Sequence, residues 1–271
     1  MSQALSSPVI LIMIDGLRPD ALAATACPNL QGFRQRGAST LTASSVMPSV
    51  TLPCHTSIFH SVPPSRHGIT TNQWQPMARP LPGLIEVAAE HKRRCAFICN
   101  WDYLRDVYRP GKMAYAYFDD SAYDPAGDET MVAEALRYFR QARPDFMFVY
   151  QSTVDVYGHN HGWMSDEYLR HVTFIDGVVG RLLDGLPEEV TILIQSDHGG
   201  HERTHGTDLP EDMTIPWLIA GPPIKQNYTI TAPVSLLDTA PTLATLLGIP
   251  PHEEWEGRCV DEVFVSGTVG Q

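Results

Sequence analysis

The chain has 271 residues and a formal net charge of −12 at pH 7, and 43% of its residues are hydrophobic whereas 18% are charged. This composition is too apolar for an intrinsically disordered chain, and the length fits one large α/β domain with a sizeable core. The acidic balance, with a pI near 5.3, argues against binding of a nucleic-acid polymer, because such binding depends on Lys and Arg that neutralise phosphates.

The N-terminal segment shows no targeting signal. Residues 1–8 contain no Lys or Arg, and the apolar run Val9–Ile14 is too short for a signal peptide or a membrane span. The five cysteines form no CxxC pair, which together with the missing signal is typical of free thiols in a reducing compartment. We therefore expect a cytoplasmic protein that does not associate with a membrane.

Strand and helix signals alternate along the chain. Short continuous apolar runs, as strands covered on both faces require, predict strands at Val9–Ile14, Cys95–Cys99, Phe146–Gln151, Val190–Gln195 and Ile215–Ala220. Helical patterns lie between them: from Pro53 to Phe59, from a cap at Asp128 to Pro144, from a cap at Ser165 to Leu186, and from Asp238 to Gly248. The alternation predicts an α/β fold with a mainly parallel central sheet and helices on both faces.

Polar side chains follow three of the predicted strands. Asp15 directly follows the first, Asp155 lies just beyond the third, and the pair Asp197–His198 follows the fourth. In parallel sheets, ligands bind beyond the carboxyl ends of the strands. With neighbouring candidates, the set comprises three carboxylates, three imidazoles and one hydroxyl: Asp15, Asp155, Asp197, His159, His198, His205 and Thr51. Mixed nitrogen and oxygen ligands suit zinc, whereas an all-oxygen set would suit Mg²⁺ or Ca²⁺.

Each part of this set also has a purely structural interpretation. Asp15 before a glycine is common in turns, and Asp155 with His159 four residues later is a common surface pair on a helix. Thr51 could merely cap the helix that follows it. Taken by themselves, the residues also leave Cys54 as a rival nucleophile.

Six segments, in order, carry a resemblance to a known family: Ile14–Arg18, Pro48–His55, His67–Asn72, Asp155–His159, Ser196–Gly199 and His205–Thr207. With them the chain resembles the alkaline phosphatase superfamily, and within it the branch of type I phosphodiesterases and nucleotide pyrophosphatases. The resemblance runs from residue 14 to about 221 and covers most of the chain.

The resemblance implies an enzyme with two Zn²⁺ ions rather than Mn²⁺. One zinc would be held by Asp15, Asp197 and His198 together with Thr51, and the other by Asp155, His159 and His205. Thr51 matches the family nucleophile, which passes through a covalent phosphothreonine, and Asn72 matches the residue that donates to a phosphate oxygen. His205 is favoured over His201 as a ligand, which leaves open whether His201 contacts metal or substrate.

The implied activity is hydrolysis of phosphodiester or pyrophosphate bonds in small phosphate esters or nucleotides. A phosphonate hydrolase of the phosphonoacetate type and a phosphomonoesterase stay open as alternatives. Sulfatases place Cys or Ser in a Cys/Ser-x-Pro-x-Arg motif, but here Thr51, Pro53 and His55 stand at those positions. A binding module without activity is disfavoured by the intact ligand set. Compared with members of this family, the chain 1–271 resembles a single catalytic domain with a short, aromatic-rich insertion on the substrate side, around 73–127.

Overall fold

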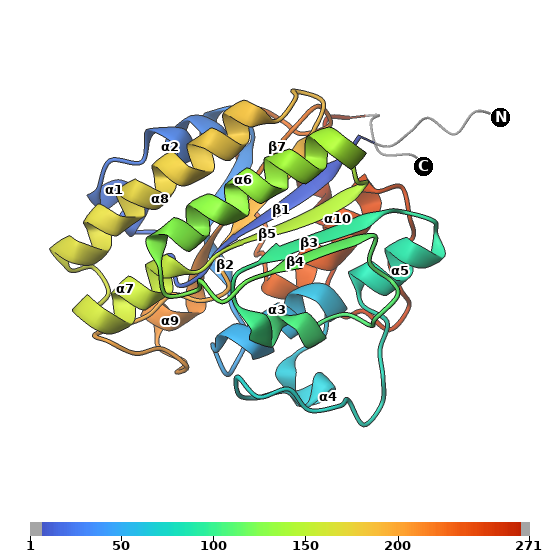
Figure 1. Ribbon diagram of the computed structural model, residues 1–271, viewed down its shortest axis with the longest axis horizontal. Helices are drawn as coiled ribbons and strands as arrows, with labels where there is room; N and C mark the ends of the chain where they lie inside the picture. The colour runs from blue at the N-terminus through green and yellow to red at the C-terminus, as the bar shows by residue number, and fades with distance from the viewer. Residues whose placement is uncertain (1–6, 267–271) are drawn as a thin grey trace.

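A computed structural model describes residues 7–266 of the chain (Figure 1). Residues 1–6, on which the expectation of a missing targeting signal partly rests, lie outside the described residues. The central sheet has the following strands: β1 (Val9–Ile14), β2 (Ala38–Ser44), β3 (Cys95–Cys99), β4 (Tyr115–Phe118), β5 (Phe146–Gln151), β6 (Thr191–Gln195), β7 (Thr214–Ala220) and β8 (Tyr228–Thr229). Their order is β4-β3-β5-β1-β6-β7-β2-β8.

The sheet is mainly parallel, which confirms the predicted fold class. Strands β4, β3, β5, β1 and β6 run parallel to one another, whereas β7 is antiparallel to both β6 and β2. The helices are α1 (Ala21–Ala24), α2 (Pro28–Gln35), α3 (Thr51–His60), α4 (Pro64–His67), α5 (Leu84–Glu90), α6 (Pro125–Ala142), α7 (Thr153–His161), α8 (Asp166–Gly185), α9 (Pro210–Met213) and α10 (Thr239–Leu246).

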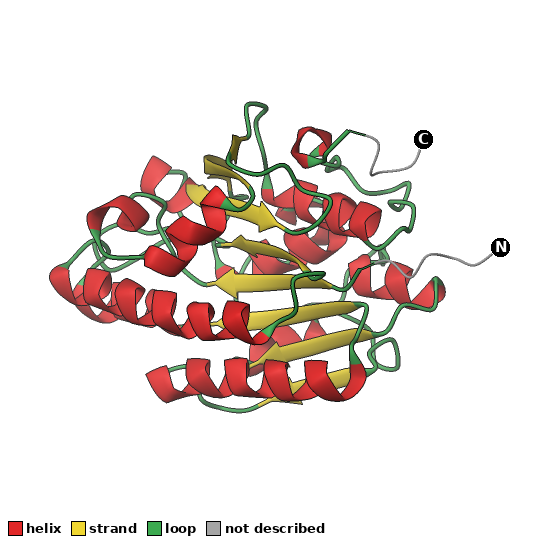
Figure 2. Ribbon diagram, turned by 90° about the horizontal axis from the view of Figure 1, so that it is seen from above, coloured by secondary structure: helices red, strands yellow, loops and turns green. Residues whose placement is uncertain are grey.

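Both faces of the sheet are covered by helices (Figures 1 and 2). Successive side chains of a strand point to opposite faces, so β1 divides its apolar residues between two cores. Ile10 and Ile12 belong to the core beneath α2, α6 and α8, whereas Leu11 and Met13 belong to the core beneath α3, α5 and α10. Within the described residues, no helix has the length and apolar character needed to cross a membrane.

The predicted bounds of β1, β3 and β5 agree with the structure, and the predicted starts of β6 and β7 differ from it by one residue. Three strands were not predicted from the sequence, namely β2, β4 and β8. The sequence of β2, ASTLTAS, has no continuous apolar run, because part of this strand is exposed. Such a strand is formed by pairing with its neighbours rather than by a local pattern.

The helix caps give one correction. Asp128 is not the N-cap of α6: the helix begins at Pro125, and its cap Asp124 accepts a hydrogen bond from the Ala126 N–H at 3.0 Å. Asp128 instead points into the protein, where its carboxylate accepts hydrogen bonds from the backbone N–H groups of Ser152 and Thr153. Asp128 thereby holds the start of α7, and the local sequence around residue 128 does not indicate this role.

The other helix starts are close to prediction. Ser165 caps α8 by accepting from the Tyr168 N–H, and Asp238 precedes α10. Helix α3 begins two residues earlier than predicted, so Thr51 is its first residue and Val50 is the capping residue. Thr51 makes no side-chain cap, which leaves its hydroxyl available for other contacts.

The segment around 73–127, expected as an insertion, also contributes to the main sheet. It contains α5, β3 and β4, and β3 pairs directly with β5 beside the centre of the sheet. Two of its aromatic residues, Trp101 and Tyr123, lie in loops at the carboxyl end of the strands and reach the cavity described below.

Candidate active site

The candidate site forms where three adjacent strands end. Strand β1 lies between β5 and β6, and the pairs Ile14–Gln151 and Met13–Gln195 show that the three strands end at nearly the same level. Asp15 follows β1 at once, Asp197 follows β6 after one residue, and Asp155 lies in the first turn of α7 just after β5. The parallel register therefore brings together carboxylates that lie far apart in the sequence.

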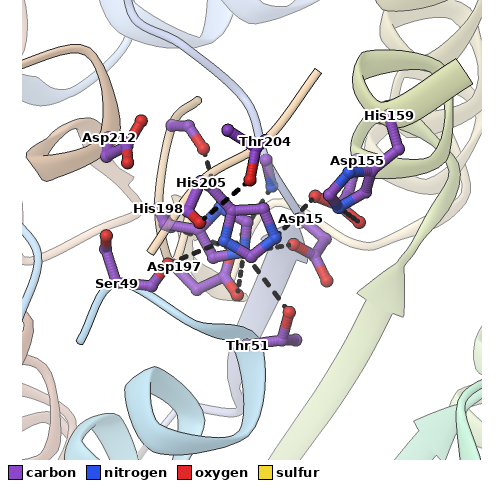
Figure 3. A network of polar contacts seen from close by, with 12 residues as sticks. Asp15, Ser49, Thr51, Asp155, His159, Asp197, His198, Thr204, His205 and Asp212 are labelled. Atoms are coloured by element: carbon purple, nitrogen blue, oxygen red, sulfur yellow. Dashed lines mark hydrogen bonds and ion pairs between the residues drawn. The ribbon is translucent and has the colours of Figure 1, made fainter. Parts of the chain in front are cut away.

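Asp15, Asp197 and His198 form what we call the inner cluster (Figure 3). His198 Nε2 lies 3.2 Å from Asp15 Oδ1 and 3.5 Å from Asp197 Oδ2. The Asp15 side chain is 3% exposed, and the other two are fully buried. These side chains place two carboxylates and one imidazole within reach of a single ion.

Asp155, His159 and His205 form what we call the outer cluster. Asp155 Oδ1 lies 3.6 Å from His205 Nε2, and Asp155 Oδ2 lies 3.5 Å from His159 Nε2. The side chain of His159 is 42% exposed, so this cluster opens towards solvent. The structure brings the ligand atoms of Asp155 and His205 within 4.8 Å of that of His198, whose ring stacks on the ring of His205 at 3.8 Å between centroids, and it does not include His159 in that group.

The three imidazoles are oriented in the same way. In each ring Nδ1 donates to a backbone carbonyl: His198 to Gly199 at 2.8 Å, His205 to Ser49 at 2.7 Å, and His159 to Arg203 at 2.9 Å. Since Nδ1 carries the hydrogen in these bonds, Nε2 faces the carboxylates in every case. Metal-ligating histidines in proteins commonly show this arrangement, because the carbonyl fixes the tautomer and the ring orientation.

The inner cluster concentrates negative charge in a buried place. Burial and the neighbouring Asp15 carboxylate raise the pKa of Asp197. Burial also disfavours the charged form of Asp15, but the neighbouring His198, together with His55 and Tyr150, brings its pKa down to about 2. Burial alone would lower the pKa of His198, yet Asp197 and Asp15 raise it. The imidazole thus supplies the positive charge that the two carboxylates require.

In the outer cluster, the negative charge of the carboxylate is less well compensated by neighbouring positive charge. Burial and the charge of Asp15 raise the pKa of Asp155 to about 7. Burial and the neighbouring His198 lower the pKa of His205 to about 3, so this imidazole is neutral at pH 7. A neutral imidazole is the form that binds a metal.

The residues present fit metal ions. One buried oxygen of each aspartate, Asp15 Oδ1, Asp155 Oδ1 and Asp197 Oδ2, accepts no hydrogen bond from any described residue. Unpaired buried carboxylate oxygens are costly, and a cation satisfies them. These oxygens also face the imidazole Nε2 atoms, so the donor set is the mixed one that zinc prefers.

Thr51 and Asn72 lie beside the clusters. Thr51 Oγ1 is 3.3 Å from His198 Nε2, at the first residue of α3. Asn72 Oδ1 accepts a hydrogen bond from the Leu52 N–H at 2.9 Å, which leaves the Asn72 NH₂ group as a donor. Both residues line the same cavity as Asp15 and Asp155, with a volume of about 230 Å³.

The cavity brings most of the predicted site residues together. Asp15, Thr51, Asn72, Asp155, His159 and His205 line it, while Asp197 and His198 lie directly beneath, in contact with Asp15. Trp101 and Tyr123 form part of its wall. Among the described residues that line the cavity, none is Lys or Arg.

Two sequence alternatives lie away from this cavity. His201 Nδ1 pairs with Asp212 Oδ1 at 2.7 Å, and the same carboxylate accepts from Thr207, so His201 stabilises the loop rather than lining the cavity. The Cys54 thiol is buried beside Ser45, and burial with the charge of Asp197 raises its pKa. A buried, protonated thiol is a poor nucleophile, which supports Thr51 over Cys54.

Sequence reasoning missed several neighbours of the clusters. Tyr150 donates a hydrogen bond to Asp15 Oδ2, and His55 Nδ1 lies 3.5 Å from Asp197 Oδ2. His55 is one turn after Thr51 in α3, a spacing that could have indicated it. Tyr150 looks like any apolar strand residue, and only the pairing of β1 with β5 places it beside Asp15.

Comparison with known proteins relates the chain to one family. The sequence profile of type I phosphodiesterase / nucleotide pyrophosphatase matches residues 9–81 and 83–210. An uncharacterized pyrophosphatase/phosphodiesterase of Schizosaccharomyces pombe is 28% identical over 225 residues, which is 71% of this chain and 44% of the relative. The ectonucleotide pyrophosphatase/phosphodiesterase family member 1 of Rattus norvegicus is 27% identical over 72% of this chain and 24% of its own length. The chain thus spans less than half of either relative.

Solved structures share the fold at low identity. The human ectonucleotide pyrophosphatase / phosphodiesterase 5 is 16% identical with a TM-score of 0.82, covering 96% of this chain and 100% of that chain. An inactive variant of the murine protein, with a Thr-to-Ala substitution and bound AMP, gives a TM-score of 0.81 at 16% identity, with 96% and 100% coverage. A 2-O GAG sulfatase gives 0.76 at 15% identity, with 94% and 73% coverage. Fold likeness alone therefore does not separate phosphate from sulfate esters.

Proposed function

Because the chain belongs to the type I phosphodiesterase / nucleotide pyrophosphatase family, we propose that it is a metal-dependent hydrolase of phosphodiester or pyrophosphate bonds. The observation that supports this most is the convergence of three aspartates, each with one buried and unpaired oxygen, beside the Thr51 hydroxyl at one cavity. A sulfatase, which shares the fold, is disfavoured because Thr51 stands where a Cys or Ser would be needed.

We propose two zinc ions as the metals. Asp15, Asp197 and His198 would hold one together with Thr51, and Asp155, His159 and His205 would hold the other. When bound, such ions lower the pKa of a coordinated hydroxyl and neutralise charge that develops on phosphoryl oxygens. The converging ligand atoms of Asp15, Asp197 and His198 support the first set, and the closeness of Asp155 to His205 supports the second. One oxygen of each of the three aspartates is unpaired.

Thr51 is the proposed nucleophile. Its Oγ1 releases a proton to solvent and attacks phosphorus, the bond from phosphorus to the leaving oxygen breaks with the electron pair going to that oxygen, and a phosphothreonine forms. A water molecule next to Asp155 then attacks the phosphorus, the bond from phosphorus to Thr51 Oγ1 breaks, and a proton of that water returns to Oγ1 as phosphate leaves. The murine neighbour that carries a Thr-to-Ala substitution is named as inactive, which supports a threonine in this role.

Two further features of this chain would stabilise the reacting phosphoryl group. Thr51 is the first residue of a ten-residue helix, and a helix N-terminus favours an anion. The Asn72 amide, fixed by its bond to Leu52, would donate to a non-bridging oxygen.

The substrate that we propose is a phosphodiester, with nucleotide-type molecules favoured. A diester carries one negative charge and a phosphomonoester carries about two, and the described residues lining the cavity offer no Lys or Arg for the second. Trp101 and Tyr123 line the wall and would accept a base or another aromatic leaving group. The murine structural neighbour was solved with AMP.

The cytoplasmic location expected from the sequence stays a prediction. All five cysteines are free thiols, and four of them are buried. This state agrees with a reducing compartment, although curated relatives include proteins named as ectonucleotide enzymes.

A substrate panel tests the proposal. Nitrophenyl esters of a phosphodiester, a phosphomonoester, a phosphonate and a sulfate are offered to the metal-free protein, with and without added Zn²⁺ or Mn²⁺. We expect the diester to be hydrolysed fastest, only with metal, and best with Zn²⁺. Thr51→Ala should lose activity at least about 10³-fold while binding metal, and wild-type protein quenched during turnover should carry phosphate on Thr51. Activity that survives chelation, or is highest on the sulfate ester, would reject the assignment.

A further inference from the structure

Trp163 lies at a point where the segments that carry both clusters meet. It belongs to the loop between α7 and α8 and is 6% exposed. Its indole N–H donates to the carbonyl of Gly16, the residue after Asp15, at 2.9 Å. The Tyr168 hydroxyl donates to the same carbonyl at 2.9 Å. The chain just beyond β1 is therefore tied to the loop that follows α7.

Two glycines pack directly against the indole. A Cβ at Gly158 would lie 2.4 Å from Trp163 Cε2, and a Cβ at Gly200 would lie 2.3 Å from the same atom. Neither position accepts a side chain without moving the ring. Gly158 immediately precedes His159, and Gly200 lies two residues after His198. The indole thus fixes the separation between helix α7 and the loop after β6.

The ring also contacts two histidines of the outer cluster. Its centroid is 5.0 Å from that of His159 and 5.8 Å from that of His205, with steep interplanar angles of 81° and 67°. These edge-to-face contacts place the indole behind both imidazoles, which face Asp155 with their Nε2 atoms. The half-exposed His159 is otherwise oriented by its Nδ1 bond to the Arg203 carbonyl and by a ring contact with His205 at 5.0 Å between centroids.

We propose that Trp163 is a positioning residue that fixes His159 and His205 relative to Asp155 and thereby sets the metal affinity of the outer cluster. This inference rests on the proposed function, because it assumes that the outer cluster binds a metal. We expect the inner cluster to depend less on Trp163, because among the described residues the ring contacts of the indole are with His159, Tyr168 and His205 and its N–H donates to a backbone carbonyl. The residues of the inner cluster also lie within three residues of the ends of β1 and β6.

The test is a calorimetric titration of the metal-free chain 1–271 with Zn²⁺. Wild-type protein should bind two equivalents. In Trp163→Leu, which lacks the ring, we expect the affinity for one equivalent to fall about 10–100-fold, the usual range for groups that support metal ligands, while the other equivalent binds as in wild type. Diesterase activity should fall in parallel and recover at high Zn²⁺, which a folding defect would not do. Trp163→Phe keeps a ring behind the imidazoles and should lose less affinity than Trp163→Leu.

The chain offers a matched control in Trp255. This tryptophan is 8% exposed, and its indole N–H likewise donates to a backbone carbonyl, that of Pro82, at 2.9 Å. It lies outside the cavity lining. Trp255→Leu should lower the free energy of unfolding but leave both Zn²⁺ affinities unchanged.

The outcomes separate the inference from the proposed function. If wild-type protein binds no Zn²⁺, the proposed function fails. If wild-type protein binds two equivalents and Trp163→Leu binds them equally well, or if Trp255→Leu weakens the same equivalent as much, the positioning role of Trp163 is wrong while the proposed function stands. Should Trp163→Leu not fold, Trp163→Phe decides by the same comparison.

Discussion

The inner and outer clusters lie side by side at one edge of the sheet, but different parts of the fold hold them. Asp15, Asp197 and His198 follow the central strands β1 and β6 within three residues and are buried. Asp155 and His159 lie on helix α7, and His205 lies on a loop; these reach the site through packing against Trp163 and the bonds that Asp128 makes to the start of α7. We infer that the sheet determines the inner cluster, whereas side-chain packing determines the outer one.

The strongest test of this difference is Asp197→Asn in the inner cluster. We expect diester turnover to fall at least about 10³-fold, or about 4 kcal/mol in the barrier, because a charged ligand is lost. Asp197 is a buried carboxylate beside Asp15. Without metal, the free energy of unfolding of the variant should therefore exceed that of wild type by about 1–3 kcal/mol. Kinetics and urea denaturation of the metal-free protein measure the two effects. A metal-free variant less stable than wild type would contradict the view that buried charge strains this cluster.

Asn72→Ala gives a reference loss of rate for comparison with variants of the two clusters, because Asn72 belongs to neither cluster. Removing one preorganised donor to a developing oxyanion costs about two orders of magnitude in rate. We expect that loss in kcat, with both Zn²⁺ equivalents still bound. Asn72→Asp keeps the acceptor for Leu52 but removes the donor, so it should not restore the rate. An unchanged kcat in Asn72→Ala would remove this residue from the mechanism.

In the outer cluster, His159→Ala should have a smaller effect on activity. The side chain is 42% exposed, so its removal should change the free energy of unfolding by no more than about 0.5 kcal/mol. We expect kcat/KM to fall on the order of tenfold at limiting Zn²⁺ and to recover at saturating Zn²⁺, because one of three protein ligands is lost. A loss as large as that of Asp197→Asn, with no recovery, would erase the proposed difference between the clusters.

The last prediction concerns the stability of the fold rather than catalysis, at Asp128, which holds the start of α7 and thereby supports the outer cluster. Burial raises its pKa to about 6 from an ordinary value of 3.8, even though Thr153 and Ser152 donate to it. Between roughly pH 4 and 6 the native protein therefore binds a proton that the unfolded chain has released, so this group lowers the free energy of unfolding as the pH rises through that window.

The measurement compares unfolding of metal-free wild type and Asp128→Asn across that pH window. The stability of wild type relative to the variant should decline as the pH rises from 4 to 6, by on the order of 1–3 kcal/mol. Above about pH 7 the difference should be constant. Parallel stability profiles over the whole range would show that Asp128 keeps an ordinary pKa.

The features that the sequence revealed are local ones. The continuous apolar run of β1 followed at once by Asp15, and the run of β6 followed by Asp197 and His198, indicate both a buried strand and a polar group at its end. Such patterns depend only on neighbours along the chain, because burial on both faces requires apolar residues at every position. They were sufficient for the fold class, for β1, β3 and β5, and for the list of candidate ligands.

Other features could not be read from local patterns. Asp128 has the spacing of a helix cap, yet Asp124 caps α6 and Asp128 instead holds the first turn of α7. Strand β2 has no apolar run, and it is formed by pairing with β7. Tyr150 and Trp163 look like core residues, but they contact Asp15 and the histidines of the outer cluster.

By itself, then, the sequence determined which residue types follow which strands, and hence that carboxylates and imidazoles would gather at one edge of a sheet. The tertiary structure decided the order of the strands, which oxygens lack a partner, and which aromatic side chains support the outer cluster. The physical reason is that these last properties depend on contacts between segments more than a hundred residues apart, such as Trp163 with Gly16, and no local pattern in the chain records such contacts.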